Sequence, residues 1–187
     1  MCIRDRLYLE RETDLLTRPV RLLHIAPEVC LMRRLKTRYR GHEELYVTAD
    51  LESPLARLHF DVQDIPLEND YAEVILCNHL LEHVADDAQA LRELYRVMKP
   101  GGWGILLSPV DPMRARTFED DTITDPAERT RLFGQYDHRR IYGRDYPARL
   151  RAAGFEVADI DYAGQLSPGE RRRYALPEDR IYVVYKN

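Results

Sequence analysis

The sequence predicts an α/β fold in which a mostly parallel, doubly wound sheet is closed by an antiparallel strand. Apolar runs of strand length alternate with segments whose apolar residues recur at helical spacing, a pattern typical of repeated strand-helix-strand units. The 187 residues, 44% of them hydrophobic, suffice for one buried core but hardly for two. We therefore expect a single domain.

The strands are predicted from short apolar runs that stop at turn-forming residues. Residues 20–25 form the first run, which is broken by Ala26-Pro27. The second run is 45–48, and the third, 58–62, leads into a turn-rich segment. The remaining strands are expected at residues 74–77, 104–108, 155–160 and 181–185.

The helices are predicted from apolar spacing and from residues that begin or end helices. The first, residues 28–38, has one apolar face formed by Val29, Met32 and Leu35. Asp86-Asp87 can cap a second helix, which Pro100-Gly101-Gly102 would stop. Residues 146–153 are expected to form a third helix, ended by Gly154.

Two segments fit this alternation poorly. Residues 111–137 are polar, have no apolar period and exceed the usual length of a connection, which is typical of a lid over a binding site. Residues 1–6 show no periodicity and lead abruptly into an amphipathic stretch. We expect residues 1–6 to be a non-native or disordered opening, and 7–187 to be a domain truncated at its N-terminus; an ordinary frayed terminus is the alternative.

Composition and charge favour small-molecule chemistry. The net charge is only -4, and the sequence has no run of basic residues that would indicate nucleic-acid or membrane binding. The three cysteines form no Cys-x-x-Cys pair, which argues against a disulfide framework and favours a reducing cytoplasm. No apolar run approaches the roughly 18 residues that span a bilayer. The oligomeric state cannot be inferred from these features.

Polar residues lie in or just after the carboxyl ends of the predicted strands, where an open parallel sheet binds ligands. Such sheets take ligands beyond the carboxyl ends of their strands. The residues at these positions are Glu28, Asp50, Asp61, Asn78 and His79. An acid after the second strand can accept hydrogen bonds from both ribose hydroxyls of a nucleoside, so we assign this role to Asp50; the alternative is that Asp50 only caps the following turn.

The stretch from Phe60 to Ser108 resembles the core of class I, Rossmann-like methyltransferases that use S-adenosylmethionine. The most specific strings are Leu81-Glu82-His83-Val84 after the fourth strand and Arg96-Val97-Met98-Lys99-Pro100-Gly101-Gly102 before the fifth. The resemblance implies S-adenosylmethionine as cofactor and methyl transfer to a small-molecule acceptor. It further implies that Asp50 binds the ribose, that Leu51 packs on adenine, that Asp61 and the backbone of Val62 contact the adenine edge, and that Asn78 and His79 line the methionine end.

The first loop departs from the family pattern of an acid followed by a glycine-rich turn. Here His24 replaces the acid, Ala26 and Glu28 stand where glycines are expected, and Pro27 removes a backbone donor. The resemblance keeps His24, Ala26 and Glu28 as cofactor-binding candidates, with Glu28 facing the cofactor's ammonium group. The string 23–28, with 133–138 and 141–143, is similar to a branch of uncharacterised bacterial methyltransferases.

The sequence contains one motif that formally resembles a metal site. His79-x-x-Glu82-His83 formally matches an inverted zinc-protease motif, but it begins at a strand end and no third ligand is apparent. Glu82 and His83 alone offer too few ligands for magnesium. We therefore predict no metal.

Methyl transfer from a sulfonium needs alignment and exclusion of water more than acid-base chemistry. Where the acceptor is a hydroxyl or amine, His79 or His138 is suitable to remove its proton; for His138 the alternative is a histidine bonded to a neighbour such as Asp137. Aromatic and cationic residues cluster at Tyr136, Arg139, Arg140 and Tyr142. They could bind the acceptor; the alternative is that they form a solvated face.

Two other functions compete with methyl transfer. A non-catalytic nucleoside-binding or interaction domain would explain the altered first loop. A dinucleotide-dependent reductase would need a Gly-x-Gly-x-x-Gly turn after the first strand, which the sequence lacks.

Overall fold

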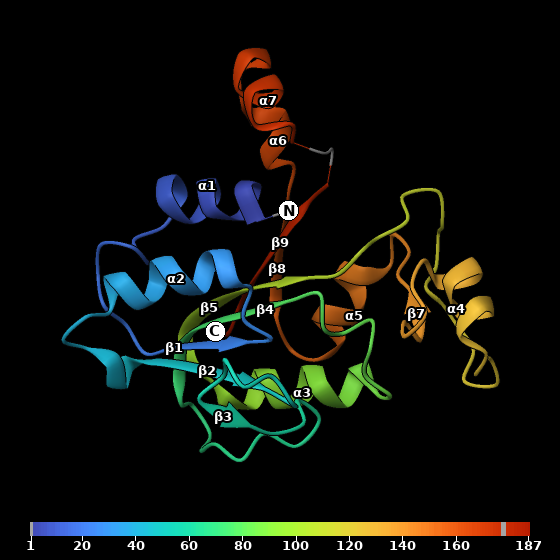
Figure 1. Cartoon of the computed structure of the whole chain (residues 1–187), viewed down its shortest axis with the longest axis horizontal. Coiled ribbons are helices and arrows are strands. Elements are labelled where there is room, and N and C mark those ends of the chain that lie inside the picture. Colours follow the sequence, from blue (N-terminus) through green and yellow to red (C-terminus); the bar gives the residue numbers. More distant parts are fainter. Residues whose placement is uncertain (1, 177–178) are drawn as a thin grey trace.

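A computed structural model describes residues 2–176 and 179–187 and contains the predicted sheet. Seven strands lie in the order β3-β2-β1-β4-β5-β9-β8 (Figure 1). They are β1 (Leu22–Ile25), β2 (Tyr46–Asp50), β3 (Leu58–His59), β4 (Ala72–Asn78), β5 (Met98–Leu107), β8 (Glu156–Ile160) and β9 (Ile181–Tyr185). β1 to β5 pair in parallel, whereas β9 is antiparallel to both β5 and β8. The predicted α/β class and antiparallel closing strand are confirmed.

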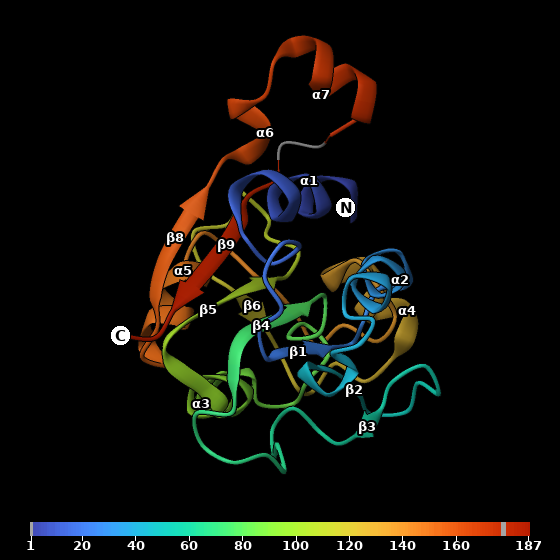
Figure 2. The ribbon, with the colours of Figure 1, turned by 90° about the vertical axis from the view of Figure 1, so that its left-hand side faces the viewer.

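Helices cover both faces of this sheet. Helices α1 (Cys2–Glu12) and α2 (Val29–Arg38) lie on one side of it, and α3 (Asp87–Val97) lies on the other (Figure 1). Helix α5 (Tyr146–Ala152) leads into β8 through Gly154, whose φ of 109° lies in the left-handed region that favours glycine. The short helices α6 (Tyr162–Gln165) and α7 (Pro168–Tyr174) extend beyond the ends of β8 and β9 (Figure 2).

The centre of the sheet carries the core because it is buried on both faces. All four residues of β1 are buried, as are most of β4 and the second half of β5, which explains why these strands read as continuous apolar runs. Gly104 on β5 is required by close packing, since a Cβ there would lie 2.6 Å from the carbonyl oxygen of Ile75. Helix α3 is capped as predicted, with the Asp86 side chain accepting from the Gln89 N–H at 2.9 Å.

Several predicted boundaries are wrong. Val29 is 43% exposed, and Leu31 takes its place on the buried face of α2. β3 stops at His59, three residues earlier than predicted. Helix α3 ends at Val97 and β5 begins at once, so the Pro-Gly-Gly turn lies within β5, because residues before a proline are pushed into extended conformations.

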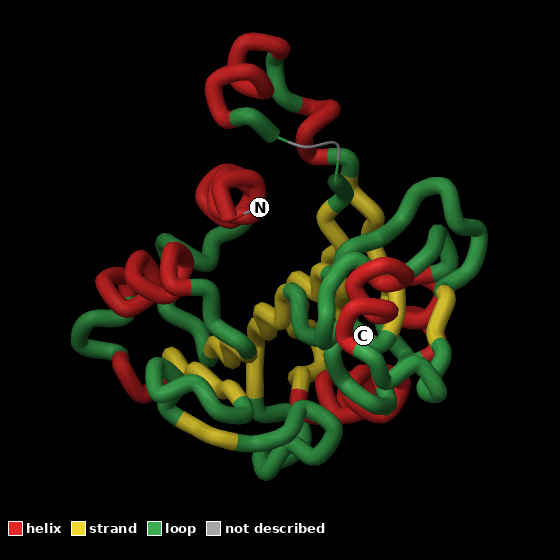
Figure 3. Tube along the Cα trace, turned by 45° about the vertical axis from the view of Figure 1, so that its right-hand side comes forward, coloured by secondary structure: helices red, strands yellow, loops and turns green. Residues whose placement is uncertain are grey.

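The predicted lid, residues 111–137, has secondary structure of its own. It contains β6 (Phe118–Glu119), paired with β7 (Arg140–Ile141), and helix α4 (Pro126–Phe133). Helix α4 has an Asp125 N-cap, a proline in its first turn and a left-handed Gly134 at its end, signals that sequence reasoning overlooked because only Phe133 of the helix is buried. Figure 3 shows how much of the chain is loop between its helices and strands.

The opening of the chain is helical where the structure describes it. Residues 2–6 belong to α1, and Arg4 and Asp5 are buried; Met1 lies outside the described residues. Whether residues 1–6 are native to the domain stays a prediction. Among the described residues, no helix is long and apolar enough to cross a membrane.

Candidate functional site

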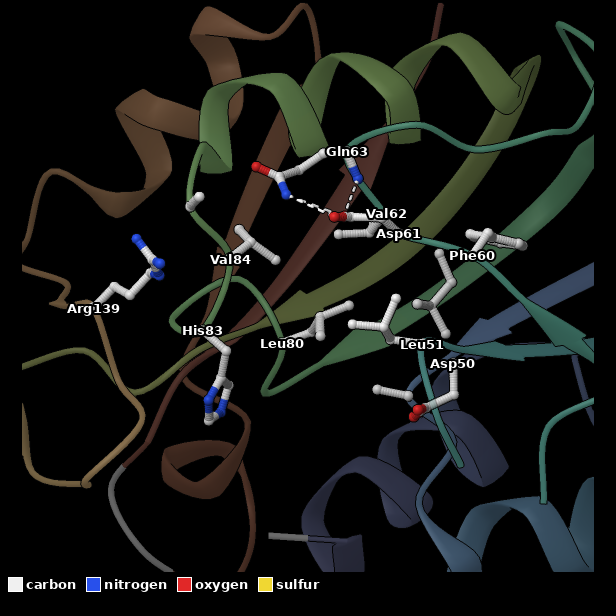
Figure 4. A pocket seen from close by; sticks show the side chains of 13 residues that line it. Asp50, Leu51, Phe60, Asp61, Val62, Gln63, Leu80, His83, Val84 and Arg139 are labelled. Atoms are coloured by element: carbon white, nitrogen blue, oxygen red, sulfur yellow. Dashed lines mark hydrogen bonds between the residues drawn. The ribbon is translucent and has the colours of Figure 1, made fainter. Parts of the chain in front are cut away.

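A cavity of about 320 Å³ lies where β1, β2 and β4 end. Its volume falls within the range of small-molecule sites, and its position is where an open α/β sheet binds ligands. The side chains in Figure 4 come from the ends of β1 and β2 and the residues just after them, from the segments that follow β3 and β4, and from Arg139 beyond α4. Its lining includes Ile25, Ala26, Asp50, Leu51, Phe60, Asp61, Val62, Leu80, His83 and Arg139.

The first loop adopts the backbone conformation that a glycine would favour. Ala26 has a φ of 49°, in the left-handed region that costs an L-residue roughly 1–2 kcal/mol. Its N–H donates to the Ala49 carbonyl of β2 at 2.8 Å, which holds the loop against the neighbouring strand. The loop therefore keeps its turn despite the missing glycines.

Three of the predicted residues form a hydrogen-bonded network beneath this loop. The Glu28 carboxylate accepts from His24 Nε2 and Asn78 Nδ2, both at 2.8 Å, while His24 Nδ1 lies 2.9 Å from the Tyr46 hydroxyl. Burial opposes the charge of Glu28, but the bonds from His24 and Asn78 outweigh it and lower the pKa of this carboxyl. Because a carboxylate can only accept, His24 Nε2 is the donor that anchors Glu28.

Asp50 combines the two roles that the sequence left open. Its Oδ1 accepts from the backbone N–H groups of Glu52 and Ser53, at 3.0 and 2.8 Å, so it does cap the turn. The side chain also lines the cavity (Figure 4), next to Leu51, which is 61% exposed. An exposed leucine beside a carboxylate provides an apolar surface and an acceptor for one ligand.

Asp61 and Val62 lie on another wall of the same cavity. Asp61 is held by Gln63, whose backbone N–H donates to Oδ1 at 2.8 Å and whose amide donates to both carboxylate oxygens (Figure 4). Val62 is buried. Gln63 was missed as a site residue because nothing in its own sequence context distinguishes it from a loop glutamine.

His79 lies on the wall of a second cavity, of about 560 Å³, together with Ser108 and Tyr182. Its φ of 54° is unusual for a histidine, and its N–H donates to the Leu107 carbonyl at 2.7 Å. His79 Nδ1 lies 3.6 Å from the buried Glu82 carboxylate, and Nε2 is buried without a hydrogen-bond partner among the described residues. The structure thus separates His79 from the residues around the first cavity.

His138 is buried, and its Nδ1 lies 3.0 Å from the Phe133 carbonyl oxygen. The structure therefore brings it to a backbone carbonyl, whereas Asp137 pairs with His83, Nδ1 to Oδ2 at 3.3 Å. The rings of His83 and His138 meet edge to face with centroids 4.7 Å apart. The segment after β4 and the segment before β7 are thus in contact.

The expected aromatic and cationic cluster is only partly exposed. Tyr136 is 62% exposed, but Arg140 is 3% exposed and Tyr142 fully buried, so a solvated face is wrong for these two. The Arg140 guanidinium donates to the carbonyls of Leu81 and Val84, both at 2.7 Å. Arg140 therefore fixes the turn after β4, a role that its local sequence did not indicate.

Comparisons with known proteins identify this architecture. Residues 16–106 match the profile of a family described as a methyltransferase domain. The matched segment covers just under half of the chain and is similar to methyltransferase domains. It is 27% identical over 101 residues to a Mycolicibacterium smegmatis protein named "probable S-adenosylmethionine-dependent methyltransferase", and the match covers 54% of this chain and 35% of the relative. The chain therefore spans well under half the length of that relative.

Solved structures share the fold of this chain. The YcgJ protein of Bacillus subtilis matches with a TM-score of 0.60 and 14% identity, over 100% of both chains. The [4+2]-cyclase SpnF matches with a TM-score of 0.57 and 17% identity, over 98% of this chain and 79% of that one. At these identities the likeness concerns the fold alone.

S-adenosylmethionine is the cofactor that the family implies. The first cavity fits its nucleoside part, because Asp50 offers acceptor oxygens to ribose hydroxyls, and Leu51 and Phe60 offer apolar surface to a purine. The carboxylate of Glu28 lies in the adjoining first loop, where a positively charged methionine group would be stabilised.

Proposed function

We propose that this domain transfers the methyl group of S-adenosylmethionine to a small-molecule acceptor. The observation that carries the proposal is that the turn after β4 borders two cavities, since Leu80 lines the first and His79 the second. A methyl donor in the first cavity and an acceptor in the second would meet at this turn. Such an arrangement supplies the alignment on which sulfonium displacement depends.

The site residues divide between these cavities. Asp50 and Leu51 bind the ribose and the adenine face, and Asp61 with the backbone of Val62 binds the adenine edge. Asn78 orients Glu28 toward the charged methionine end. When bound, the cofactor would supply the methyl group: the carbon–sulfur bond would break with its electron pair left on sulfur, the acceptor oxygen or nitrogen would form the new bond to carbon, and the acceptor would give up a proton.

His79 is the general base of the proposal. Its Nε2 has no hydrogen-bond partner among the described residues, and its Nδ1 faces the Glu82 carboxylate. A proton taken from an acceptor hydroxyl by Nε2 would be stabilised by that negative charge. His138 is less suited to this step, because it is held on the Phe133 carbonyl beyond the turn.

The cofactor assignment is tested by calorimetric titration with S-adenosylhomocysteine. Asp50→Asn keeps an oxygen that can cap the turn but removes the charge, and we expect at least tenfold weaker binding, about 1.4 kcal/mol. Asp64→Asn, at an exposed acid outside the cavity lining, is the matched control and should bind like the wild type. Absence of wild-type binding, or equal binding by Asp50→Asn, would overturn the assignment.

A non-catalytic nucleoside-binding domain is the second candidate, favoured by the altered first loop. It predicts S-adenosylhomocysteine binding without transfer of a labelled methyl group to any of a panel of alcohols and amines. The methyltransferase proposal predicts transfer to at least one, with a lower kcat in His79→Gln and S-adenosylhomocysteine affinity within about twofold of wild type.

A further inference from the structure

Three potential metal ligands that are far apart in the sequence converge beside the first cavity. Ligand atoms of Glu82, His83 and His138 all lie within 4.8 Å of one another. The contact is built by the backbone, because the Arg139 N–H donates to the Glu82 carbonyl at 2.9 Å. Sequence reasoning found only Glu82 and His83, since 54 residues separate His138 from His83.

Both histidines are held by one ring nitrogen, which leaves the other available. His138 Nδ1 lies 3.0 Å from the Phe133 carbonyl, to which only an N–H can donate, so Nε2 is the ring nitrogen that remains for a metal. His83 Nδ1 lies 3.3 Å from the Asp137 carboxylate, which orients it in the same way. Metal-binding histidines are typically oriented by such a carbonyl or carboxylate.

Glu82 is unusual because it is a carboxylate with 1% of its surface exposed. Its Oε2 accepts from the Ser108 hydroxyl at 2.9 Å, and its Oε1 lies 3.6 Å from His79 Nδ1. In the part of the chain that the structure describes, no lysine or arginine pairs with this side chain. Buried charges in proteins are normally paired or coordinate a metal.

We propose that Glu82, His83 and His138 bind a divalent transition metal, with zinc as the fitting ion. Two imidazoles and one carboxylate are the donor set of catalytic zinc sites with an open fourth position. Two nitrogen donors disfavour magnesium and calcium, which take oxygen ligands. This proposal differs from the sequence analysis, which predicted no metal.

The geometry requires only side-chain movement. Ligands of tetrahedral zinc lie about 3.3 Å apart, given metal-nitrogen distances of about 2.0 Å, so separations of up to 4.8 Å must close by about 1.5 Å at most. His83 lines the first cavity, which gives an ion a path to the cluster. Figure 4 shows His83 and Arg139 on the opposite side of the view from Asp50 and Phe60, so the ion would not compete for the ribose position.

The test is calorimetric titration of the chelator-treated full chain with zinc chloride, without any cofactor or acceptor. We expect one equivalent to bind with micromolar or tighter affinity, and at least tenfold weaker binding in His83→Gln and in His138→Gln. His42→Gln, which changes an exposed histidine outside the cluster, is the control and should bind like the wild type. Circular dichroism verifies that each variant is folded.

Cobalt gives a second readout that does not depend on the variants. Co²⁺ in a four-coordinate site with two nitrogen ligands should show strong visible absorption that added zinc abolishes. The proposal is overturned if the wild type binds no zinc, or if folded His83→Gln and His138→Gln bind as tightly as wild type. Because these titrations use the metal alone, their outcome is independent of the proposed methyl transfer.

Discussion

Replacing Arg140 by leucine should unfold the connection between the turn after β4 and the segment before β7. The guanidinium is 3% exposed and donates to the carbonyls of Leu81, Val84 and Ala85 at 2.7, 2.7 and 3.0 Å. Its Nε also pairs with Glu119 at 2.9 Å. Hydrogen bonds from a charged donor contribute about 1.5–3 kcal/mol each, and breaking a buried charged network costs about 3–5 kcal/mol. We expect a loss of about 3–5 kcal/mol in the free energy of unfolding, measured by urea denaturation.

Two further variants isolate the cause of that loss. Arg140→Lys keeps the charge but replaces a planar fork with one ammonium group, so it should recover only part of the stability. Arg131→Leu removes an arginine whose side chain is 70% exposed and should change stability by no more than about 0.5 kcal/mol. A loss below about 1 kcal/mol in Arg140→Leu would show that the buried guanidinium does not hold this turn.

Three other substitutions should change the stability by smaller amounts. Ala26→Gly should raise the free energy of unfolding by about 0.5–1 kcal/mol, because it relieves the left-handed φ of 49° at some cost in chain entropy; an unchanged urea midpoint would contradict this. Gly104→Ala should cost about 1–3 kcal/mol, since its Cβ meets the Ile75 carbonyl at 2.6 Å, and a wild-type thermal midpoint would refute the close approach. Asp86→Ala should cost about 1 kcal/mol of helix capping, measured against Asp86→Asn, which retains the cap.

The fold was predictable because the signals that specify it are local. The runs that became β1, β4 and β5 are apolar on both faces, and Asp86 capped its helix as its position predicted. The cavity residues Asp50 and Asp61 were found for the same reason, because Asp50 was expected just after the second strand and Asp61 near the end of the third. Boundaries failed where a neighbour decided them, as at Val29, where Leu31 packs instead.

The residues that contact the turn after β4 could not be predicted, because these are tertiary contacts between residues far apart in the sequence. Arg140 and His138 read as ordinary polar residues near the end of a long loop, and nothing in their sequence context indicates burial. Their role depends on a segment more than 50 residues away, which the Arg140 bonds to Leu81 and Val84 hold in place. Residue spacing alone therefore found two members of the Glu82 cluster and missed the third.

The network around Glu28 predicts a loss of stability in acid. The pKa of Glu28 is lowered in the folded chain, where burial opposes the charge but bonds from His24 and Asn78 outweigh it. A lowered folded pKa contributes stability that is present above the unfolded pKa of about 4.3 and is lost as pH falls through the folded value. Asp87, whose pKa is lowered because bonds from Arg149 and Tyr142 outweigh its burial, adds a loss of the same sign.

Comparing Glu28→Gln with wild type separates the Glu28 contribution from that of Asp87. Glutamine has one acceptor oxygen for two donors and no charge, so at about pH 7 the variant should be less stable by about 1.5–3 kcal/mol. The difference should shrink below about pH 4.3 as the wild-type carboxylate is protonated, while the exposed Glu44→Gln control stays within about 0.5 kcal/mol of wild type throughout. If the difference in unfolding free energy between Glu28→Gln and wild type did not change with pH, the shape of the Glu28 side chain, and not its charge, would stabilise this loop. The carboxylate would then give a cationic ligand no electrostatic reason to bind beside it.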